Sequence, residues 1–192
     1  MDSVSKIVSS ESEELILVDT QDNETGHRSK AECHDGDGIL HRAFSLFLFN
    51  GHRELLLQRR GESKRLWPGY WSNSCCSHPR RGESIHTATQ RRLSDELNVT
   101  ATLEYVYKFR YRASFGDAGA ENELCHVFLG TTGGVLRPNV SEIAAVRFVT
   151  ARELSAELEA DADAFTPWFK MEWLALNRKF PEMLARYCDI DH

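Results

Sequence analysis

The apolar residues follow a strand-like pattern through most of the first two thirds of the chain. Two β-rich runs, 43–49 and 54–58, flank Asn50-Gly51, which is the strongest short signal for a hairpin. We therefore expect these two runs to pair in antiparallel fashion. Further strand-like runs lie at 15–18, 103–112, 123–129 and 144–149. A glycine-rich turn at 116–119 separates the second of these runs from the third.

Helical patterns interrupt and then follow these runs. Apolar residues recur at helical spacing over 84–97, which predicts a helix there. Thr166 followed by Pro167 has the order of an N-cap and a first-turn proline, and Pro181 opens a further helix. The fold class expected is α/β or α+β, with a mixed sheet flanked by helices. The polar segment 21–38 carries reactive side chains, and we expect it to fold over a site.

Length and composition indicate one domain. The 192 residues, of which 41% are hydrophobic, are enough for one buried core and too few for two independent ones. The first residues are rich in Ser and Glu. We expect a solvated tail at 1–14 and a single domain at 15–192.

Charge and cysteine content exclude several classes of function. With 23 basic and 29 acidic residues the net charge is -6, which argues against a nucleic-acid partner. No apolar run reaches the roughly 18 residues of a transmembrane helix, and the first 14 residues do not resemble a signal peptide. Five cysteines without a C-x-x-C pair are expected to be free thiols. We expect a cytoplasmic protein without a membrane partner.

Histidines and glutamates form a candidate metal site. His34, His41 and His78 lie near other reactive residues, and imidazole is the commonest metal ligand. If a strand begins at 121, its period of two places Glu121 and Glu123 on one face. Three nitrogens and two carboxylates suit Mn²⁺, Zn²⁺ or Mg²⁺ in five- or six-fold coordination rather than a closed structural zinc. Solvated histidines and two strand-edge glutamates are the alternative.

A candidate nucleophile or acid lies in the segment 67–79, which combines two tryptophans, two adjacent cysteines and a histidine. Strand alternation would direct one of Cys75 and Cys76 into the core and the other into a cleft, and we expect Cys76 to face the cleft. A nearby cationic centre would lower the pKa of its thiol. Core packing of both cysteines is the alternative.

The predicted helix also has the character of a diphosphate-binding element. Gly82-Glu83 followed by 91–99 resembles the signature helix of the Nudix superfamily, which presents acidic groups to a metal-bound diphosphate. Arg92 stands where a hydrolytic member would have a glutamate, and a guanidinium can bind phosphate but not Mg²⁺. Diphosphate binding is therefore favoured over hydrolysis. Asn98 stands where such a helix usually ends in glycine.

Several separated motifs together resemble the type I isopentenyl diphosphate isomerases, which have the Nudix fold. They are His34 with His41, Arg59-Arg60-Gly61-Glu62-Ser63-Lys64, Trp67-Pro68-Gly69, Asn73-Ser74-Cys75-Cys76-Ser77-His78-Pro79, Phe109-Arg110-Tyr111-Arg112-Ala113 and Glu121-Asn122-Glu123. The resemblance extends over about 15–178, with the Nudix core at about 41–175. It implies that the protein interconverts isopentenyl and dimethylallyl diphosphate, a small isoprenoid substrate.

The resemblance also implies roles for single residues. The metal ligands fall on His34, His41, His78, Glu121 and Glu123. A second Mg²⁺ would bridge the diphosphate with help from Glu96, and diphosphate contacts would come from Lys30, Arg60, Lys64 and Arg92. Cys76 and Glu123 would act as the acid/base pair of the 1,3 proton shift, with Tyr111 hydrogen-bonded near the glutamate. Trp168 would present an aromatic face to the carbocation.

Two other functions stay open from the sequence. A Nudix hydrolase of a nucleoside diphosphate would share the fold and metals, and a noncatalytic binding module stabilised by zinc would use the histidines and cysteines. No flavin motif is present, so no organic cofactor is expected. We expect a monomer.

Overall fold

Nine strands form one mixed sheet within residues 7–189, the part of the chain that the computed structural model describes. Only β3 and β8 pair in parallel; the other strand pairings are antiparallel. The strands are β1 (Glu14–Val18), β2 (Glu24–Ser29), β3 (His41–Phe49), β4 (Leu55–Arg60), β5 (Trp71–Ser72), β6 (Cys75–Ser77), β7 (Thr102–Ser114), β8 (Ala120–Thr131) and β9 (Ile143–Val149).

Five α-helices accompany the sheet in the described residues. They are α1 (Lys30–His34), α2 (Ile85–Leu97), α3 (Ala151–Ala160), α4 (Pro167–Lys179) and α5 (Pro181–Leu184), with short 3₁₀ turns at Gly116–Ala118 and Ala162–Ala164. The expected class, a mixed sheet flanked by helices, is confirmed.

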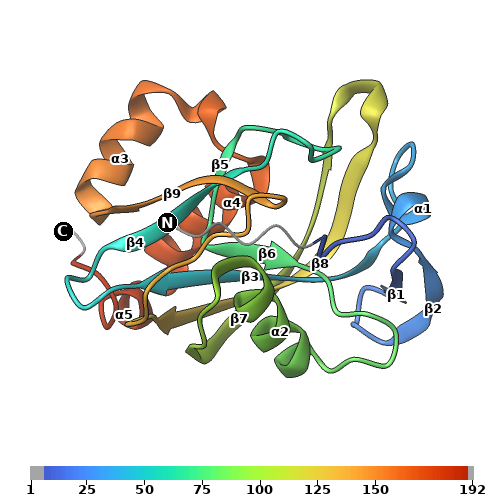
Figure 1. The fold of residues 1–192 in the computed structure, drawn as a ribbon, viewed down its shortest axis with the longest axis horizontal. Coiled ribbons are helices and arrows are strands. Elements are labelled where there is room, and N and C mark those ends of the chain that lie inside the picture. Colours follow the sequence, from blue (N-terminus) through green and yellow to red (C-terminus); the bar gives the residue numbers. More distant parts are fainter. Residues whose placement is uncertain (1–6, 190–192) are drawn as a thin grey trace.

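Strand β3 lies at the centre of the core because both of its faces are apolar. Phe44, Leu46 and Leu48 pack with residues of α2, whereas Phe47 and Phe49 pack with residues of α3 and α4. Figure 1 shows α2 on one side of the sheet and α3 on the other. Because successive side chains of a strand alternate between faces, one continuous apolar run serves both layers.

The helices expected over 84–97, after Thr166 and from Pro181 are confirmed. The Ser84 hydroxyl accepts a hydrogen bond from the Thr87 backbone N–H, at 3.1 Å, and α2 begins at the next residue. Asn98 ends α2 in the left-handed conformation, with φ of 57°, which asparagine tolerates better than most residues. Thr166 precedes α4, whose first residue is Pro167.

Regular structure also forms where the sequence indicated only turns. The segment 21–38 contains β2 and α1, and α1 begins with a capping box in which Ser29 and Glu32 bond reciprocally to each other's backbone N–H. Strand β2 is an edge strand paired with β1. Its side chains are mostly polar, so apolar alternation could not reveal it.

A glycine allows the hairpin of β7 and β8 to approach α1. Gly119 has φ of 130°, and a Cβ atom there would lie 2.1 Å from the carbonyl oxygen of His34. Any larger residue would push α1 away from β8. The contact therefore brings His34 beside the first residues of β8.

Among residues 7–189, no helix is both long enough and apolar enough to cross a bilayer.

Candidate active site

A cavity of about 340 Å³ opens beside β6 and β8 and collects most of the residues singled out in the sequence. Its wall includes Lys30, His34, Arg60, Lys64, Cys76, His78, Arg92, Tyr111, Glu121, Glu123 and Trp168. His41 and Glu96 are buried behind this wall, at 0% and 2% exposure. Residues that are far apart in the sequence therefore share one site.

Five side chains converge at one end of the cavity. His34 ends α1, His41 begins β3, His78 follows β6, and Glu121 and Glu123 lie at the start of β8. One ligand atom from each lies within 4.8 Å of all the others. The five residues that spacing and chemical type nominated therefore form one cluster.

Backbone carbonyls orient two of the imidazoles. His34 Nδ1 lies 2.8 Å from the Lys30 carbonyl oxygen, and His41 Nδ1 lies 2.7 Å from that of Ile39. A carbonyl can only accept, so each Nδ1 carries a proton, and each Nε2 faces the cluster, where a bound cation would take its lone pair.

The cluster has the polar atoms that a cation would satisfy. Nε2 of His34, Nε2 of His41 and Oε2 of Glu121 are buried without a hydrogen-bond partner among residues 7–189. His34 Nε2 and Glu121 Oε2 are only 2.9 Å apart, yet they do not have hydrogen-bond geometry. Buried polar atoms are rarely left unsatisfied, so their common focus fits a divalent metal ion.

Protonation states in the cluster also suit metal binding. Burial, together with the charges of His41 and His34, holds the pKa of His78 well below its ordinary value, so this imidazole is neutral. Burial alone would raise the pKa of Glu121, but the neighbouring His34 lowers it, and the carboxylate stays ionised. The same His34 has its pKa raised, because burial, the largest single effect, is outweighed by the combined influence of Glu121 and Glu123. A bound cation would replace that proton.

The two candidate acid/base groups lie in the wall of the same cavity. Cys76 is half-buried there, whereas Cys75 is fully buried in the core. Tyr111 donates a hydrogen bond of 2.6 Å to Glu123 Oε2, and His78 Nε2 lies 2.8 Å from Glu123 Oε1. Both oxygens of Glu123 are thus held in place.

The two groups have pKa values shifted in opposite directions. Burial raises the pKa of Cys76 to about 12, although Arg60 opposes the rise. A cationic group lowers this pKa, as expected, but desolvation of the thiolate outweighs the arginine. Burial would also raise the pKa of Glu123, but the charge of the neighbouring His41 imidazole, 3.7 Å away, and the hydrogen bond from Tyr111 keep it below its ordinary value. The site holds a thiol beside a carboxylate.

Cations and carboxylates alternate along another part of the wall. Arg92 donates to Glu96 through Nε, at 2.8 Å, and its Nη2 lies 3.2 Å from Glu142 Oε2. Lys64 pairs with the same carboxylate oxygen of Glu142. All four residues are mostly buried, so their charges must be balanced locally. The two basic side chains can therefore bind an anionic ligand, and the two carboxylates can bind a cation.

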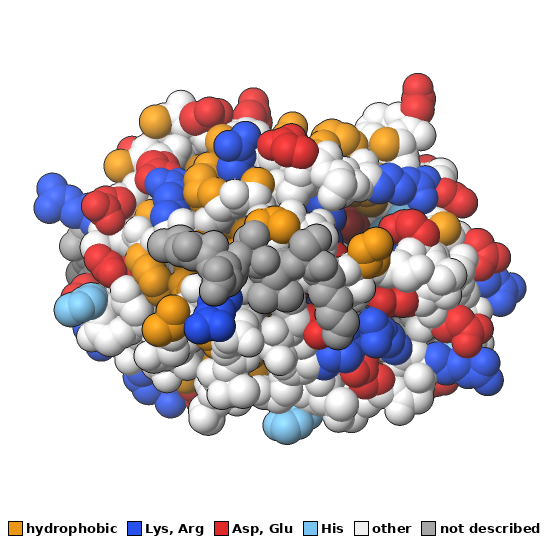
Figure 2. Space-filling view, viewed as in Figure 1, with side chains coloured by type: hydrophobic (Ala, Val, Ile, Leu, Met, Phe, Trp, Pro, Cys, Tyr) orange, Lys and Arg blue, Asp and Glu red, His pale blue; other side chains and the backbone are white. Residues whose placement is uncertain are grey.

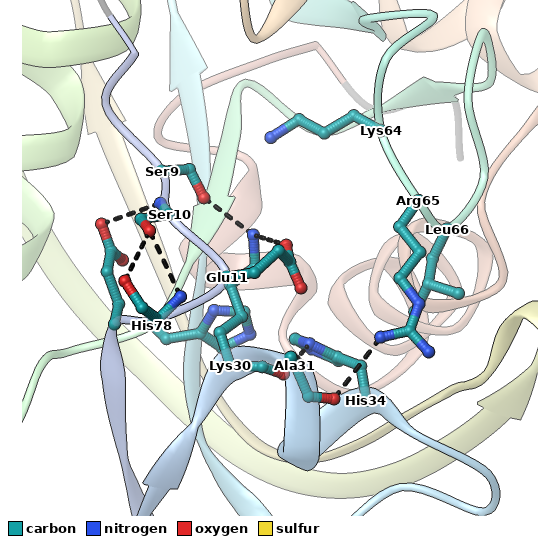
Figure 3. A network of polar contacts seen from close by, with 12 residues as sticks. Ser9, Ser10, Glu11, Lys30, Ala31, His34, Lys64, Arg65, Leu66 and His78 are labelled. Carbon is teal, nitrogen blue, oxygen red and sulfur yellow. Dashed lines mark hydrogen bonds and ion pairs between the residues drawn. The ribbon is translucent and has the colours of Figure 1, made fainter.

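The N-terminal segment crosses the mouth of this cavity. Lys30 Nζ lies 2.8 Å from Ser9 Oγ and 3.1 Å from Glu11 Oε1, and Figure 3 shows both side chains directed towards the Lys30 ammonium. The carbonyl oxygen of Val8, a buried residue, accepts from Arg92 at 2.8 Å. Residues 8–11 lie in the segment expected to be a solvated tail, yet here they contact two candidate diphosphate-binding cations.

Trp168 forms an aromatic wall of the cavity. It lies edge-on to Trp67, with ring centroids 5.2 Å apart, and 6.2 Å from the ring of Tyr111. The guanidinium of Arg60 lies over its ring at 5.2 Å. The side chain is only 3% exposed, so its ring is shielded from water.

Three polar residues of this region were not found from the sequence. Glu142 pairs with Lys64 and Arg92, Ser72 contacts Trp168, and Glu172 is fully buried beside Cys125. Their partners lie 45 or more residues away in the chain, beyond the reach of local patterns. Only a signal of spatial contact could have identified them.

The outer surface also carries side chains of both charges. Figure 2 shows acidic and basic side chains interspersed over the face drawn there, without a continuous basic stripe. Surface arginines such as Arg53, Arg65 and Arg112 pair with aspartates.

Comparisons with known proteins agree on one family. The NUDIX domain model matches residues 39–169. The chain is 42% identical to isopentenyl-diphosphate Delta-isomerase 1 of Photorhabdus laumondii over 163 residues, covering 84% of this chain and 93% of that protein. It is 41% identical to the isopentenyl-diphosphate Delta-isomerase of Serratia proteamaculans over 157 residues, covering 82% and 87%.

Solved structures share the fold at low sequence identity. The protein DR0079 of Deinococcus radiodurans superposes with a TM-score of 0.66 at 21% identity, covering 91% of this chain and 99% of that one. A MutT protein of Methanosarcina mazei gives a TM-score of 0.56 at 18% identity, covering 77% and 94%. These two likenesses support the architecture alone.

Proposed function

We propose that this chain, which belongs to the isopentenyl-diphosphate Delta-isomerase family of NUDIX domain proteins, interconverts isopentenyl diphosphate and dimethylallyl diphosphate. The observation that carries the proposal is one cavity lined by a protonated thiol, an ionised carboxylate and several cations. Each of these groups has a use in that reaction.

The reaction moves a double bond by adding one proton and removing another. A proton is added at the terminal alkene carbon, and a proton leaves C2, so one donor and one acceptor must flank the substrate. Cys76 and Glu123 have complementary protonation states, and the reverse reaction exchanges their roles. We assign them as the acid/base pair, with Tyr111 holding Glu123 by its hydrogen bond.

The tertiary carbocation formed between the two proton transfers needs electrostatic stabilisation. Trp168 is a shielded aromatic wall, and cation–π attraction to a desolvated ring is worth about 2 kcal/mol or more. The neutral alkene gains little from it, so the stabilisation is specific to the charged state. Exclusion of water from the cavity also protects the cation.

The diphosphate would bind at the wall of alternating charges. We propose that Lys30, Arg60, Lys64 and Arg92 contact it. Lys64 and Arg92 are already balanced by Glu142 and Glu96, so a dianionic or trianionic group needs a further cation. Glu96 is the residue that we propose to hold Mg²⁺ there.

The cluster of three histidines and two glutamates would hold a second divalent ion. Its mixed nitrogen and oxygen donors fit Mn²⁺, Zn²⁺ or Mg²⁺. When bound, the ion would supply positive charge next to Glu123. The chain's own part is to hold the imidazoles through backbone carbonyls and the carboxylate through Tyr111.

Hydrolysis of a nucleoside diphosphate is the competing reaction on this fold. Arg92 lies within the diphosphate wall and forms an ion pair with Glu96, so it cannot serve as a carboxylate ligand for a hydrolytic metal.

The direct test supplies the purified protein with Mg²⁺ and Mn²⁺ and then with isopentenyl diphosphate or a panel of nucleoside diphosphate derivatives. We expect dimethylallyl diphosphate to form and no phosphate or nucleoside monophosphate to be released. Release of phosphate from the panel without isomerisation would contradict the proposed function.

A further inference from the structure

Ser72 connects two walls of the cavity. We propose that Ser72 is a positioning residue for the isomerisation, which holds the Trp168 indole in its working orientation beside the Cys76 thiol. This inference rests on the function proposed above and extends it to a residue outside the motifs that suggested it.

The Ser72 hydroxyl is the meeting point of several side chains. The residue is fully buried at the end of β5. Trp168 donates its indole N–H to Ser72 Oγ at 3.1 Å, and Cys76 Sγ lies 4.0 Å from the same oxygen. Ser72 in turn donates to Asn73 Oδ1 at 2.9 Å. One hydroxyl therefore contacts both the aromatic wall and the candidate acid/base thiol.

The start of α4 is attached to β5 through the same residues. The Thr166 backbone N–H donates to the Trp71 carbonyl at 2.9 Å, and the Thr166 hydroxyl lies 3.0 Å from Ser72 Oγ. Thr166 is the N-cap residue of α4, but its side chain makes no capping hydrogen bond to the helix. Its hydroxyl bonds to Ser72 instead, so the position of Trp168, the second residue of α4, is coupled to β5.

Hydrogen-bond chemistry indicates what removal of this hydroxyl would do. A serine hydroxyl has one proton and two lone pairs. Here Ser72 donates its proton to Asn73, and its lone pairs accept from the Trp168 N–H and the Thr166 hydroxyl. Without Ser72 Oγ the buried indole N–H would lose its acceptor. The free-energy cost of an unpaired buried donor would then favour a different orientation of the ring. The ring face presented to the carbocation would then change.

A purely structural role for Ser72 would give a different result, and Ser74 provides the matched control. Ser74 is equally buried two residues away, where it donates to the Leu56 carbonyl at 2.6 Å and accepts from the Leu48 N–H at 2.8 Å. These contacts hold strands together and do not reach Trp168 or Cys76. Ser74→Ala should therefore lower stability without a specific effect on turnover.

The experiment compares kcat and KM for isopentenyl diphosphate in wild type, Ser72→Ala, Ser72→Thr and Ser74→Ala, below the unfolding transition of each. We expect Ser72→Ala to lower kcat about tenfold, equivalent to about 1.4 kcal/mol, with KM within about twofold. Ser72→Thr keeps the hydroxyl and should restore most of kcat. Ser74→Ala should keep the kcat of the wild type.

A second measurement reports the hydrogen bond without turnover. The indole N–H resonance of Trp168, assigned with Trp168→Phe, should shift in Ser72→Ala and stay in place in Ser74→Ala.

Equal kcat in Ser72→Ala and wild type, or equal losses in the two alanine variants, would overturn the positioning role and leave the proposed function intact. A wild-type protein that does not isomerise the substrate would overturn both.

Discussion

Burial controls the protonation of the side chains around the cavity, but their hydrogen-bond partners decide the outcome. Cys76 and Glu123 are both desolvated, yet the pKa of the thiol rises to about 12 and that of the carboxyl falls. The difference arises because the hydrogen bond from Tyr111 and the charge of His41 outweigh burial at Glu123, whereas the charge of Arg60 does not outweigh it at Cys76. One cavity can thus hold a proton donor beside a proton acceptor.

Glu172 is a buried carboxyl group whose hydrogen bonds do not offset the effect of burial on its pKa. It is fully buried on α4, and burial raises its pKa from 4.5 to about 8, although bonds to Ser45 and Cys125 oppose the rise. The folded state therefore binds this proton more tightly than the unfolded state. Stability from this group is greatest below about pH 4.5 and is lost as pH rises towards about 8.

Replacement of Glu172 by glutamine should remove this dependence. At pH 7 the buried carboxyl costs roughly 3 kcal/mol, from the difference between the unfolded pKa and the pH. The free energy of unfolding of Glu172→Gln, measured with urea, should therefore exceed that of wild type at pH 8. The difference should be smaller at pH 5. Glu159→Gln, at an exposed position on α3, is the control. A stability difference that does not change with pH would contradict the account.

The residues of the candidate site divide into those that local sequence could and could not reveal. The period of two along a strand sufficed to pair Glu121 with Glu123. No local pattern connects Glu142 to Lys64 or Ser72 to Trp168, because these contacts depend on how distant elements pack.

At the level of elements, the strongly apolar or well-capped segments were predictable and the polar ones were not. The apolar run at β3 and the helical spacing of apolar residues in α2 follow directly from the sequence. Strand β2 was missed because it is a polar edge strand. Helix α3 was missed although Thr150 and Glu153 form a capping box, a signal that the sequence carried.

The close contact between the β7–β8 hairpin and α1 gives a prediction for metal binding. Gly119→Ala would place a methyl group against the His34 carbonyl and also strain a backbone with φ of 130°. We expect α1 to move and the affinity for Mn²⁺, measured by calorimetry on metal-free protein, to fall about tenfold, or about 1.4 kcal/mol.

Gly51→Ala is the control for this substitution. A Cβ atom at Gly51 would meet no other atom within 4 Å. Its Mn²⁺ affinity should equal that of wild type. Equal affinities in Gly119→Ala and wild type would mean that the approach of α1 to β8 does not position the metal ligands.

For the whole molecule, the packing of the sheet explains why the site lies where it does. Two apolar clusters cover opposite faces of β3, and polar side chains lie at the start of β3 and of β8. In the parallel pairing of these strands His41 lies opposite Glu123. The end of α1 and the segment after β6 lie at the same place. The protein carries a net charge of -6, yet the cavity concentrates cations against buried glutamates. Affinity for a diphosphate is therefore a local property.

The central claim is that Cys76 and Glu123 move the two protons of an allylic isomerisation. The most direct measurement follows isopentenyl diphosphate by NMR in D₂O with metal-loaded wild type, Cys76→Ala, Glu123→Gln and the control Cys188→Ala. Wild type and control should form dimethylallyl diphosphate with deuterium in the new methyl group. The two site variants should be slower by about 10²–10⁴-fold, the range of general acid/base catalysis. Full activity in either site variant, or no deuterium in the product of the wild type, would contradict the account.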